Sequence, residues 1–216
     1  MDAVAWDQRY AASELVWSAG PNQWIEDVGR DLTPGLALDV AAGEGRNAIW
    51  LARQGWRVVA ADFSTVAIDR ARALAAAQLG AHAHRVHAVV ADATQAAPGE
   101  PGIYDLVVVC YLQLPEPAWA AVLRQAVNAL APHGRVVIVL HARENVTRGY
   151  GGPQDVSVLH DPHDVVAVLA ELPVAVDVER AELVTRVVED ANGRHEAIDT
   201  LIVARRRPGP QIPPGV

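Results

Sequence analysis

The sequence predicts a three-layer α/β/α fold built on a mostly parallel sheet. Short apolar runs rich in valine alternate with longer runs of helical pattern, which is typical of a parallel sheet covered on both faces by helices. A glycine-containing turn joins the first apolar run to a helix start. Near the end of the chain, Asn192 and Gly193 stand between two apolar runs, which is a strong signal for a β-hairpin. We therefore expect the sheet to close with an antiparallel C-terminal hairpin strand.

The individual elements follow from the order of these runs. Strands are expected near residues 36–41, 57–61, 86–91, 104–110 and 134–141. Helices are expected near residues 45–54, 64–79, 116–130 and 162–171. Ser64 is a suitable N-cap for the second helix, and Gly80 is a suitable end for it. Asp161 and Pro162 open the last helix, with Asp164 in its first turn.

The C-terminal part of the chain changes character. Residues 174–188 are expected to be extended, residues 190–193 to form a turn, and residues 195–205 to form another strand. A dinucleotide-binding domain would instead continue with parallel β-α-β units, so the hairpin argues against one. Residues 208–216 contain too few apolar side chains to pack, and we expect them to be disordered. Residues 1–207 are expected to form a single domain.

Composition excludes several classes of partner. The chain has 216 residues and a net charge of −8, which argues against a nucleic-acid partner, because such binding relies on neutralising phosphates. No apolar run resembles a signal peptide or reaches membrane-spanning length. The one cysteine, Cys110, cannot form an internal disulfide. These features predict a soluble, cytoplasmic protein with no nucleic-acid or membrane partner, and they leave its oligomeric state open.

The chain contains no lysine. It therefore lacks the phosphate-loop lysine of nucleoside triphosphatases and any lysine for a Schiff base. The Tyr-x-x-x-Lys pair of short-chain dehydrogenases is also missing. This pair is the commonest catalytic group for hydride transfer on a fold of this size, so its absence argues against hydride transfer.

The turn after the first strand has the features of a nucleotide-cofactor site. Gly43 and Gly45 let the backbone approach a ligand where a β-carbon would collide. Asp62 ends the second apolar run, about 20 residues further on, where an acid can accept hydrogen bonds from both ribose hydroxyls. The spacing Gly43-x-Gly45-x-x-Ala48 also satisfies the dinucleotide-binding fingerprint, so the glycines alone leave the nucleotide open.

Asp39, at the tip of the first strand, favours one nucleotide over the others. A carboxylate at this position would repel a pyrophosphate, but it can pair with an ammonium group. A nucleoside with a positive sulfur and an amino-acid tail meets both demands, and that molecule is S-adenosylmethionine. The alternative is that Asp39 only caps the helix that follows the turn.

The sequence resembles class I S-adenosylmethionine-dependent methyltransferases. The resemblance is carried by residues 38–45, by Asp62-Phe63-Ser64 and by Ala91-Asp92-Ala93. Residues 6–10 and 46–48 resemble the small-molecule branch that includes thiopurine and tellurite methyltransferases. The likeness extends from Trp6 to about Ala204 and implies a Rossmann-like methyltransferase sheet. The family usually has glycine at Ala41 and often cysteine at Ala42, so this turn carries two additional β-carbons.

The resemblance implies a set of cofactor contacts. The main chain of Ala41, Gly43 and Gly45 would lie against the methionine part, and Asp39 would reach its ammonium group. Asp62 would accept both ribose hydroxyls. The adenine would meet Phe63, unless that side chain is a plain core aromatic, and would also meet Asp92 and Ala93. The backbone of Cys110 and Tyr111 would lie beneath the sulfonium, while the Cys110 thiol is expected to be an apolar filler.

The N-terminal leader, residues 1–33, contains Trp6, Trp17 and Trp24. In the related branch such a leader folds over the cofactor as a lid, and Arg9 would clamp the methionine carboxylate. The alternatives are a helix that packs its aromatic side chains on the sheet and an exposed ion pair of Arg9.

The segment after the fifth strand, residues 141–163, is where this family builds its acceptor sites. His141 is at a strand's C-terminal tip, where ligands lie in open α/β sheets, and we expect it to be the general base, with Glu144 or Asp155 as the acid that orients it. His160 and His163 are weaker candidates. Three histidines with nearby carboxylates could also hold a divalent ion, but the spacing is not specific enough to assign a metal site.

The acceptor is the least constrained part of the prediction. Residues 110–115 lack the Asn/Asp-Pro-Pro-Tyr/Phe pattern used to methylate exocyclic amines of nucleic-acid bases. The polar loop after the fifth strand favours a hydroxyl-bearing small molecule such as a sugar, glycoside or phenol, and hence O-methylation. Thiol, tellurite or amine methylation is the alternative to O-methylation. A nicotinamide-dependent oxidoreductase and a non-catalytic cofactor-binding module are the rival classes.

Overall fold

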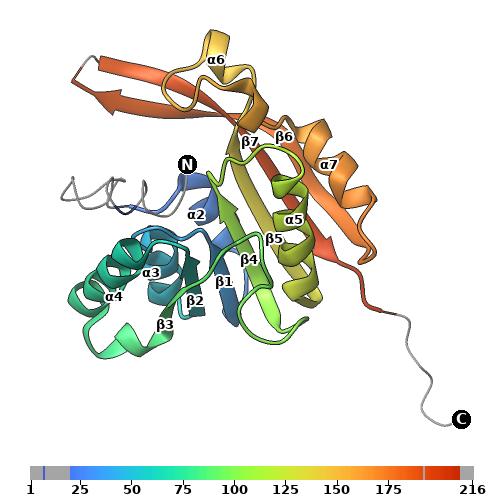
Figure 1. Cartoon of the computed structure of the whole chain (residues 1–216). Helices are drawn as coiled ribbons and strands as arrows, with labels where there is room; N and C mark the ends of the chain where they lie inside the picture. The colour runs from blue at the N-terminus through green and yellow to red at the C-terminus, as the bar shows by residue number, and fades with distance from the viewer. Residues whose placement is uncertain (1–6, 8–19, 192, 210–216) are drawn as a thin grey trace, which may run out of the picture.

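The computed structural model describes Asp7 and residues 20–191 and 193–209. Within these residues a seven-stranded sheet has the order β3-β2-β1-β4-β5-β7-β6 (Figure 1). The strands are β1 (Leu36–Val40), β2 (Arg57–Asp62), β3 (Val86–Val90), β4 (Tyr104–Cys110), β5 (Leu130–His141), β6 (Val176–Asp190) and β7 (Gly193–Arg206). The first five strands pair in parallel, whereas β7 runs antiparallel to both β5 and β6.

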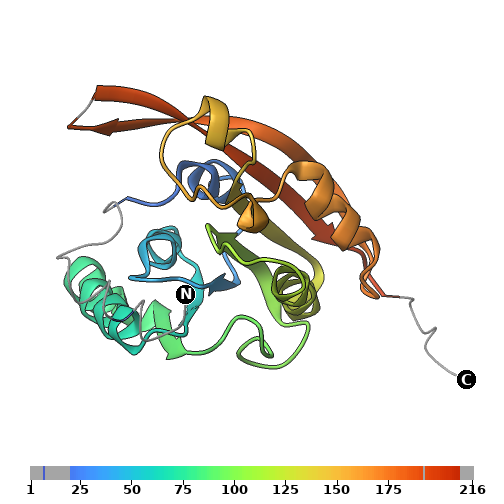
Figure 2. The ribbon, with the colours of Figure 1, turned by 45° about the horizontal axis from the view of Figure 1, so that its top comes forward.

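Helices cover both faces of this sheet (Figure 2). On one face lie α2 (Gln23–Gly29), α3 (Arg46–Arg53) and α4 (Thr65–Leu79); on the other lie α5 (Ala118–Ala129) and α7 (Pro162–Ala170). In β4, Val107 and Val109 belong to the core under α5, while Leu106 and Val108 belong to the core under α3. This alternation follows from the two-residue period of a strand. The predicted three-layer fold is confirmed.

The predicted strands and helices match the structure closely, and the caps are as expected. The Ser64 side chain accepts a hydrogen bond from the Ala67 amide at the start of α4, and Gly80 ends that helix with a φ of 54°. Asp161 and Asp164 form a reciprocal capping box at the start of α7. Polar side chains that satisfy free amides at these positions fix where each helix begins.

The differences lie in short segments that have no clear periodicity. The short helices η1 (Gly80–Arg85), α6 (Asn145–Arg148) and η2 (Val156–Val158) were not expected. Strand β5 begins at Leu130 instead of near residue 134, and its pairing with β4 is irregular between Tyr104 and Leu106. Elements of three to six residues are too short to show an apolar repeat, so a reading based on periodicity misses them.

The C-terminal hairpin is longer than the sheet needs. Strand β7 pairs with β5 only from Arg205 to Asp199, yet β6 and β7 remain paired as far as Asp190 and Gly193. The far end of the hairpin therefore projects past the carboxyl end of β5, and α6 lies over it (Figure 1). Asn192, in the expected turn, lies outside the described residues.

The leader is described only in part. Residues 20–33 contain α2, and Trp24 packs against the core between the sheet and α3. Trp6, Trp17 and Arg9 lie outside the described residues, as do 210–216 of the expected tail. None of the helices in the described part of the chain has the length and apolar content needed to cross a bilayer.

The N-cap of α4 offers a test of this fold, because this helix follows Asp62. Replacing Ser64, which is fully buried, by alanine should lower the free energy of unfolding by about 1 kcal/mol, since the Ala67 amide loses its acceptor. Ser157, which is exposed, provides the control, and Ser157→Ala should leave stability unchanged. Urea denaturation measures both variants. Equal midpoints for the two would show that the cap contributes nothing.

Candidate active site

The residues singled out by the sequence meet at one edge of the sheet. Asp39 is the penultimate residue of β1 and Asp62 is the last residue of β2, while Cys110 and His141 end β4 and β5. Asp92 follows β3 by two residues. Because the carboxyl ends of parallel strands lie at the same edge, these side chains surround one region, where open α/β sheets bind their ligands.

Two buried carboxylates hold the turn between β1 and α3. Asp62 accepts a hydrogen bond from the Gly43 amide at 2.8 Å and another from the Ser64 amide at 2.9 Å. Asp39 accepts one from the Ala48 amide, in the first turn of α3, at 3.1 Å. Asp39 and Asp62 are 1% and 4% exposed. Asp39 therefore makes the helix-capping contact that was its alternative role.

Burial dominates the protonation of both acids. It raises the pKa of Asp39 from its ordinary 3.8 to about 7, against the opposing effects of the Ala48 amide and the Arg46 charge. It also raises the pKa of Asp62, although the Ser64 and Gly43 amides oppose this. When folding raises the pKa of an acid, the protein becomes less stable as pH rises from the pKa of the unfolded state to the pKa of the folded state. A cation beside Asp39 would favour its ionised form.

The turn itself carries backbone strain at an alanine. Ala41 has a φ of 54°, in the left-handed region that favours glycine, and Gly43 and Gly45 follow with φ of 55° and 81°. A β-carbon in this region crowds the backbone at a cost of about 1–2 kcal/mol. The chain thus keeps the local conformation of the glycine turn at Ala41 without the glycine that usually permits it.

A small cavity, partly open to solvent, lies between the sheet and α5. Its lining is mostly apolar and includes Leu38, Val40, Ala61, Ala91, Ala93, Ala97 and Val122. Asp92 is at its polar side, where its carboxylate accepts hydrogen bonds from the Thr94 amide and hydroxyl at 2.9 and 2.8 Å. Phe63 is partly buried at the end of β2. An apolar cavity with one carboxylate is suited to a flat heterocycle that carries an amino group.

The Cys110 thiol is unsuited to nucleophilic attack. Its burial raises its pKa to about 12, so the thiolate is scarcely populated at neutral pH.

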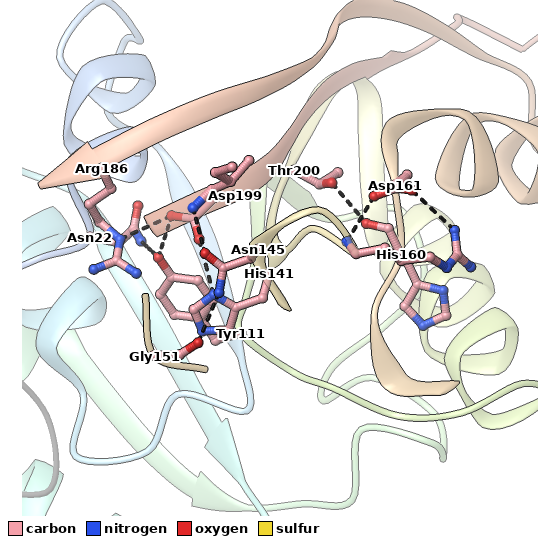
Figure 3. A network of polar contacts seen from close by, with 12 residues as sticks. Asn22, Tyr111, His141, Asn145, Gly151, His160, Asp161, Arg186, Asp199 and Thr200 are labelled. Atoms are coloured by element: carbon pink, nitrogen blue, oxygen red, sulfur yellow. Dashed lines mark hydrogen bonds and ion pairs between the residues drawn. The ribbon is translucent and has the colours of Figure 1, made fainter. Parts of the chain in front are cut away.

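A polar network joins the ends of β4 and β5 to β7 (Figure 3). Its centre is Asp199, whose side chain is fully buried and which sequence reasoning did not single out. The Tyr111 hydroxyl donates to Asp199 Oδ2 at 2.7 Å, and Arg186 Nε donates to the same oxygen at 3.0 Å. His141 Nδ1 lies 3.2 Å from Asp199 Oδ1. Asn22 donates to the Tyr111 hydroxyl at 3.0 Å, which connects α2 to the network.

The structure does not bring the expected acids to His141. Glu144 forms an ion pair with Arg148, and Asp155, which is exposed, accepts the Ser157 amide at the start of η2. Asp199 takes the place beside His141 because the two residues are paired across β5 and β7. The signal in the sequence was a lone aspartate inside the apolar run 197–204, but its partner depends on the register of the hairpin.

The other two histidines lie apart from this network. His160 is buried against the Trp119 ring, with ring centroids 5.0 Å apart, and its Nε2 is 3.0 Å from the Leu114 carbonyl oxygen. His163 is exposed. With Asp161 and Asp164 it has ligand atoms within 4.8 Å of one another. The Arg143 guanidinium forms ion pairs with both aspartates, so each carboxylate already has a cationic partner.

The loop after β5 folds over the His141 ring. A β-carbon at Gly152 would lie 3.0 Å from His141 Cδ2, so only glycine fits against the ring as it stands. Asn145 holds this loop: its Oδ1 accepts the Ile198 amide of β7 at 2.7 Å and its Nδ2 donates to the Gly151 carbonyl at 2.9 Å. The Tyr111 ring stacks on His141 with a centroid distance of 4.6 Å.

Residues 37–134 match the model of a family described as a methyltransferase domain. No curated protein sequence matches the chain significantly.

Several solved structures share the fold. One comes from work on the conversion of a disulfide bond into a thioacetal group during echinomycin biosynthesis; it is 20% identical, with a TM-score of 0.76 over 95% of this chain and 92% of that one. TehB from Haemophilus influenzae is 17% identical, with a TM-score of 0.67 over 87% of this chain and 63% of that one. Magnesium protoporphyrin IX methyltransferase from Synechocystis, solved with bound S-adenosylhomocysteine, is 18% identical, with a TM-score of 0.62 over 85% and 82%.

The strain at Ala41 can be tested directly. Ala41→Gly should raise the free energy of unfolding by about 0.5–1 kcal/mol, because the relief of the left-handed strain exceeds the added entropy of the unfolded chain. Ala42→Gly is the matched control, since Ala42 is buried and its φ is not in that region; it should lower stability. Both values come from urea denaturation. A loss of stability in Ala41→Gly comparable with that of the control would contradict the strain.

The raised pKa of Asp39 predicts a pH-dependent affinity for S-adenosylhomocysteine. The dissociation constant should increase roughly tenfold between pH 8 and pH 6, because the protonated carboxyl no longer pairs with the ligand's ammonium group. The Asp39→Asn variant should bind more weakly and lose this dependence. Isothermal titration calorimetry across the interval measures both proteins. A wild-type affinity that does not change with pH would exclude Asp39 as the partner of the ammonium group.

Proposed function

We propose that the chain uses S-adenosylmethionine to methylate a hydroxyl of a small molecule, with His141 as the general base. Residues 37–134 match a family described as a methyltransferase domain. The observation that carries this proposal is the place of His141. It lies at the carboxyl end of β5, stacked on Tyr111, at the same sheet edge as the glycine turn.

The cofactor is expected to lie along the carboxyl ends of β1, β2 and β4. Asp39 would pair with its ammonium group and Asp62 would accept its ribose hydroxyls. The adenine would enter the cavity beside Asp92 and Ala93, with Phe63 against one face. The turn at Ala41, Gly43 and Gly45 and the backbone at Cys110 would contact the methionine part. Arg9, expected to clamp the carboxylate, lies outside the described residues.

The neighbourhood of Tyr111 relates His141 to the donor side of the site. The Arg46 guanidinium, at the first residue of α3, lies 5.9 Å from the centroid of the Tyr111 ring. The His141 ring stacks on the same Tyr111 ring, with a centroid distance of 4.6 Å. An acceptor placed beside His141 would therefore be close to a methyl group held over the turn. Methyl transfer from a sulfonium is an in-line displacement, so the protein's main task is to align the acceptor and exclude water.

A hydroxyl acceptor benefits from a base, and histidine suits this role at neutral pH. The His141 side chain is only 12% exposed, and the glycine loop that covers it can exclude water from the reacting groups. A sulfur acceptor is the second candidate, because the solved structure with a TM-score of 0.76 comes from a study of disulfide-to-thioacetal conversion. A thiol ionises more readily than an alcohol and depends less on a base.

The choice between these acceptors predicts how His141 behaves. His141→Gln should lower kcat on hydroxyl acceptors by about 10²–10⁴-fold, the usual contribution of a general base, while the affinity for S-adenosylhomocysteine changes little. The exposed His163 provides the control, and His163→Ala should keep full activity. Turnover is measured with methyl-labelled cofactor on panels of sugars, glycosides, phenols and thiols.

Two outcomes would count against the proposal. Methylation of thiols alone would favour the sulfur acceptor. Full activity of His141→Gln on a hydroxyl acceptor would remove His141 from the role of base.

A further inference from the structure

We infer that Asp199 is the positioning residue for His141, and that Tyr111 and Arg186 fix Asp199 in that role. The inference rests on the proposed function, in which His141 removes the acceptor's proton. It assigns to the hairpin strands a direct part in the reaction, because Asp199 is on β7 and Arg186 is on β6.

The two oxygens of Asp199 have different partners. Oδ2 accepts hydrogen bonds from the Tyr111 hydroxyl at 2.7 Å and from Arg186 Nε at 3.0 Å. Oδ1 lies 3.2 Å from His141 Nδ1, although the two atoms are not aligned for a hydrogen bond. Both of these atoms are buried, and among the residues that the structure describes neither has another hydrogen-bond partner. Buried polar atoms rarely remain unpaired, so Oδ1 and Nδ1 are each other's natural partners.

The surroundings keep Asp199 ionised. Burial alone would raise its pKa, but the His141 contact, the Arg186 charge and the Tyr111 hydrogen bond together hold the pKa below its ordinary value. Tyr111 remains a neutral donor, because burial and the Asp199 charge place the pKa of its hydroxyl well above 10. The carboxylate is therefore a fixed negative charge that faces one nitrogen of His141.

The contacts around Asp199 are rigidly built. Tyr111 has a φ of 55°, a left-handed conformation that only strong surrounding contacts maintain in a residue with a β-carbon. Its hydroxyl also accepts a hydrogen bond from Asn22 of α2 at 3.0 Å. The Arg186 guanidinium lies 5.5 Å from the centroid of the Tyr111 ring. Residues at the ends of β4 and β5 and on β6 thus converge on the Asp199 carboxylate, and Asn22 holds the Tyr111 hydroxyl (Figure 3).

This arrangement selects one tautomer of the histidine. With Asp199 ionised, His141 carries its proton on Nδ1, directed at Oδ1, and Nε2 keeps its lone pair for the acceptor. During transfer, the acceptor's O–H proton passes to Nε2 while the acceptor oxygen forms a bond to the methyl carbon. The carbon–sulfur bond breaks and its electron pair stays on sulfur, which gives S-adenosylhomocysteine. Asp199 stabilises the His141 imidazolium until the imidazolium releases the acceptor's proton to water.

The test is the Asp199→Asn variant, followed by two readouts. We expect kcat on the hydroxyl acceptor to fall by about 10²-fold or more, with the dissociation constant of S-adenosylhomocysteine within threefold of wild type, because the tautomer changes while the cofactor contacts stay. Nitrogen-15 NMR of the labelled His141 ring should show the Nδ1-protonated tautomer in the wild type and its loss in the variant. Glu182→Gln, which removes the charge from an arginine contact on the same hairpin, is the matched control and should match the wild type in both readouts.

Tyr111→Phe is a second variant, in case Asp199→Asn does not fold. It keeps the ring that stacks on His141 but removes the hydroxyl that donates to Asp199, so a smaller fall in kcat and a partial change of tautomer are expected. An unchanged His141 tautomer in either variant would overturn the inference, whatever the turnover.

The result can be separated from a failure of the proposed function. If His141→Gln keeps full turnover, the base role fails, and that experiment does not involve Asp199. If His141→Gln is inactive but the tautomer in Asp199→Asn is that of the wild type, the base stands and Asp199 has only a structural role.

Discussion

The site depends on two carboxylates that are buried at the ends of adjacent strands. Asp39 and Asp62 lie at the carboxyl ends of the paired strands β1 and β2. Asp39 accepts the Ala48 amide of α3, and Asp62 accepts the Gly43 amide of the turn after β1 and the Ser64 amide. These hydrogen bonds fix the turn, and the turn fixes where α3 begins. A buried carboxylate carries a desolvation cost that hydrogen bonds offset only in part, as the raised pKa of Asp39 shows. A cationic nucleoside would add a positive charge beside Asp39, where the Arg46 charge alone does not offset burial.

A second constraint comes from the C-terminal hairpin. Its pairing with β5 brings Asp199 to His141, and its excess length beyond β5 supports the loop that covers the same histidine. The antiparallel strand is therefore more than an end to the sheet. It supplies the carboxylate at the centre of the polar network, while β4 and β5 supply the aromatic pair. The glycine-turn side and the His141 side of the site are built by different parts of the chain, and Tyr111 contacts both, through Arg46 and His141.

The sequence predicts the features that depend on local order and fails where register decides. Strand and helix positions follow from apolar periodicity, and Asp39, Asp62 and His141 are found because each lies at or next to the end of a strand. The sequence predicts that Glu144 or Asp155 is the acid beside His141. In the structure, Glu144 pairs with Arg148, and Asp155 accepts a hydrogen bond from the Ser157 amide. Asp199 lies 58 positions further along (199 minus 141) and reaches His141 only through the pairing of β5 with β7. No local pattern encodes that pairing, because a shift of one residue would turn Asp199 to the other face.

The most direct measurement is a crystal structure grown with S-adenosylhomocysteine. We expect its ammonium group beside Asp39, both ribose hydroxyls on Asp62, its adenine in the cavity next to Ala93, and its sulfur on the side of Tyr111 and His141. An adenosine bound at any other edge of the sheet, or ribose hydroxyls that make no contact with Asp62, would contradict the account.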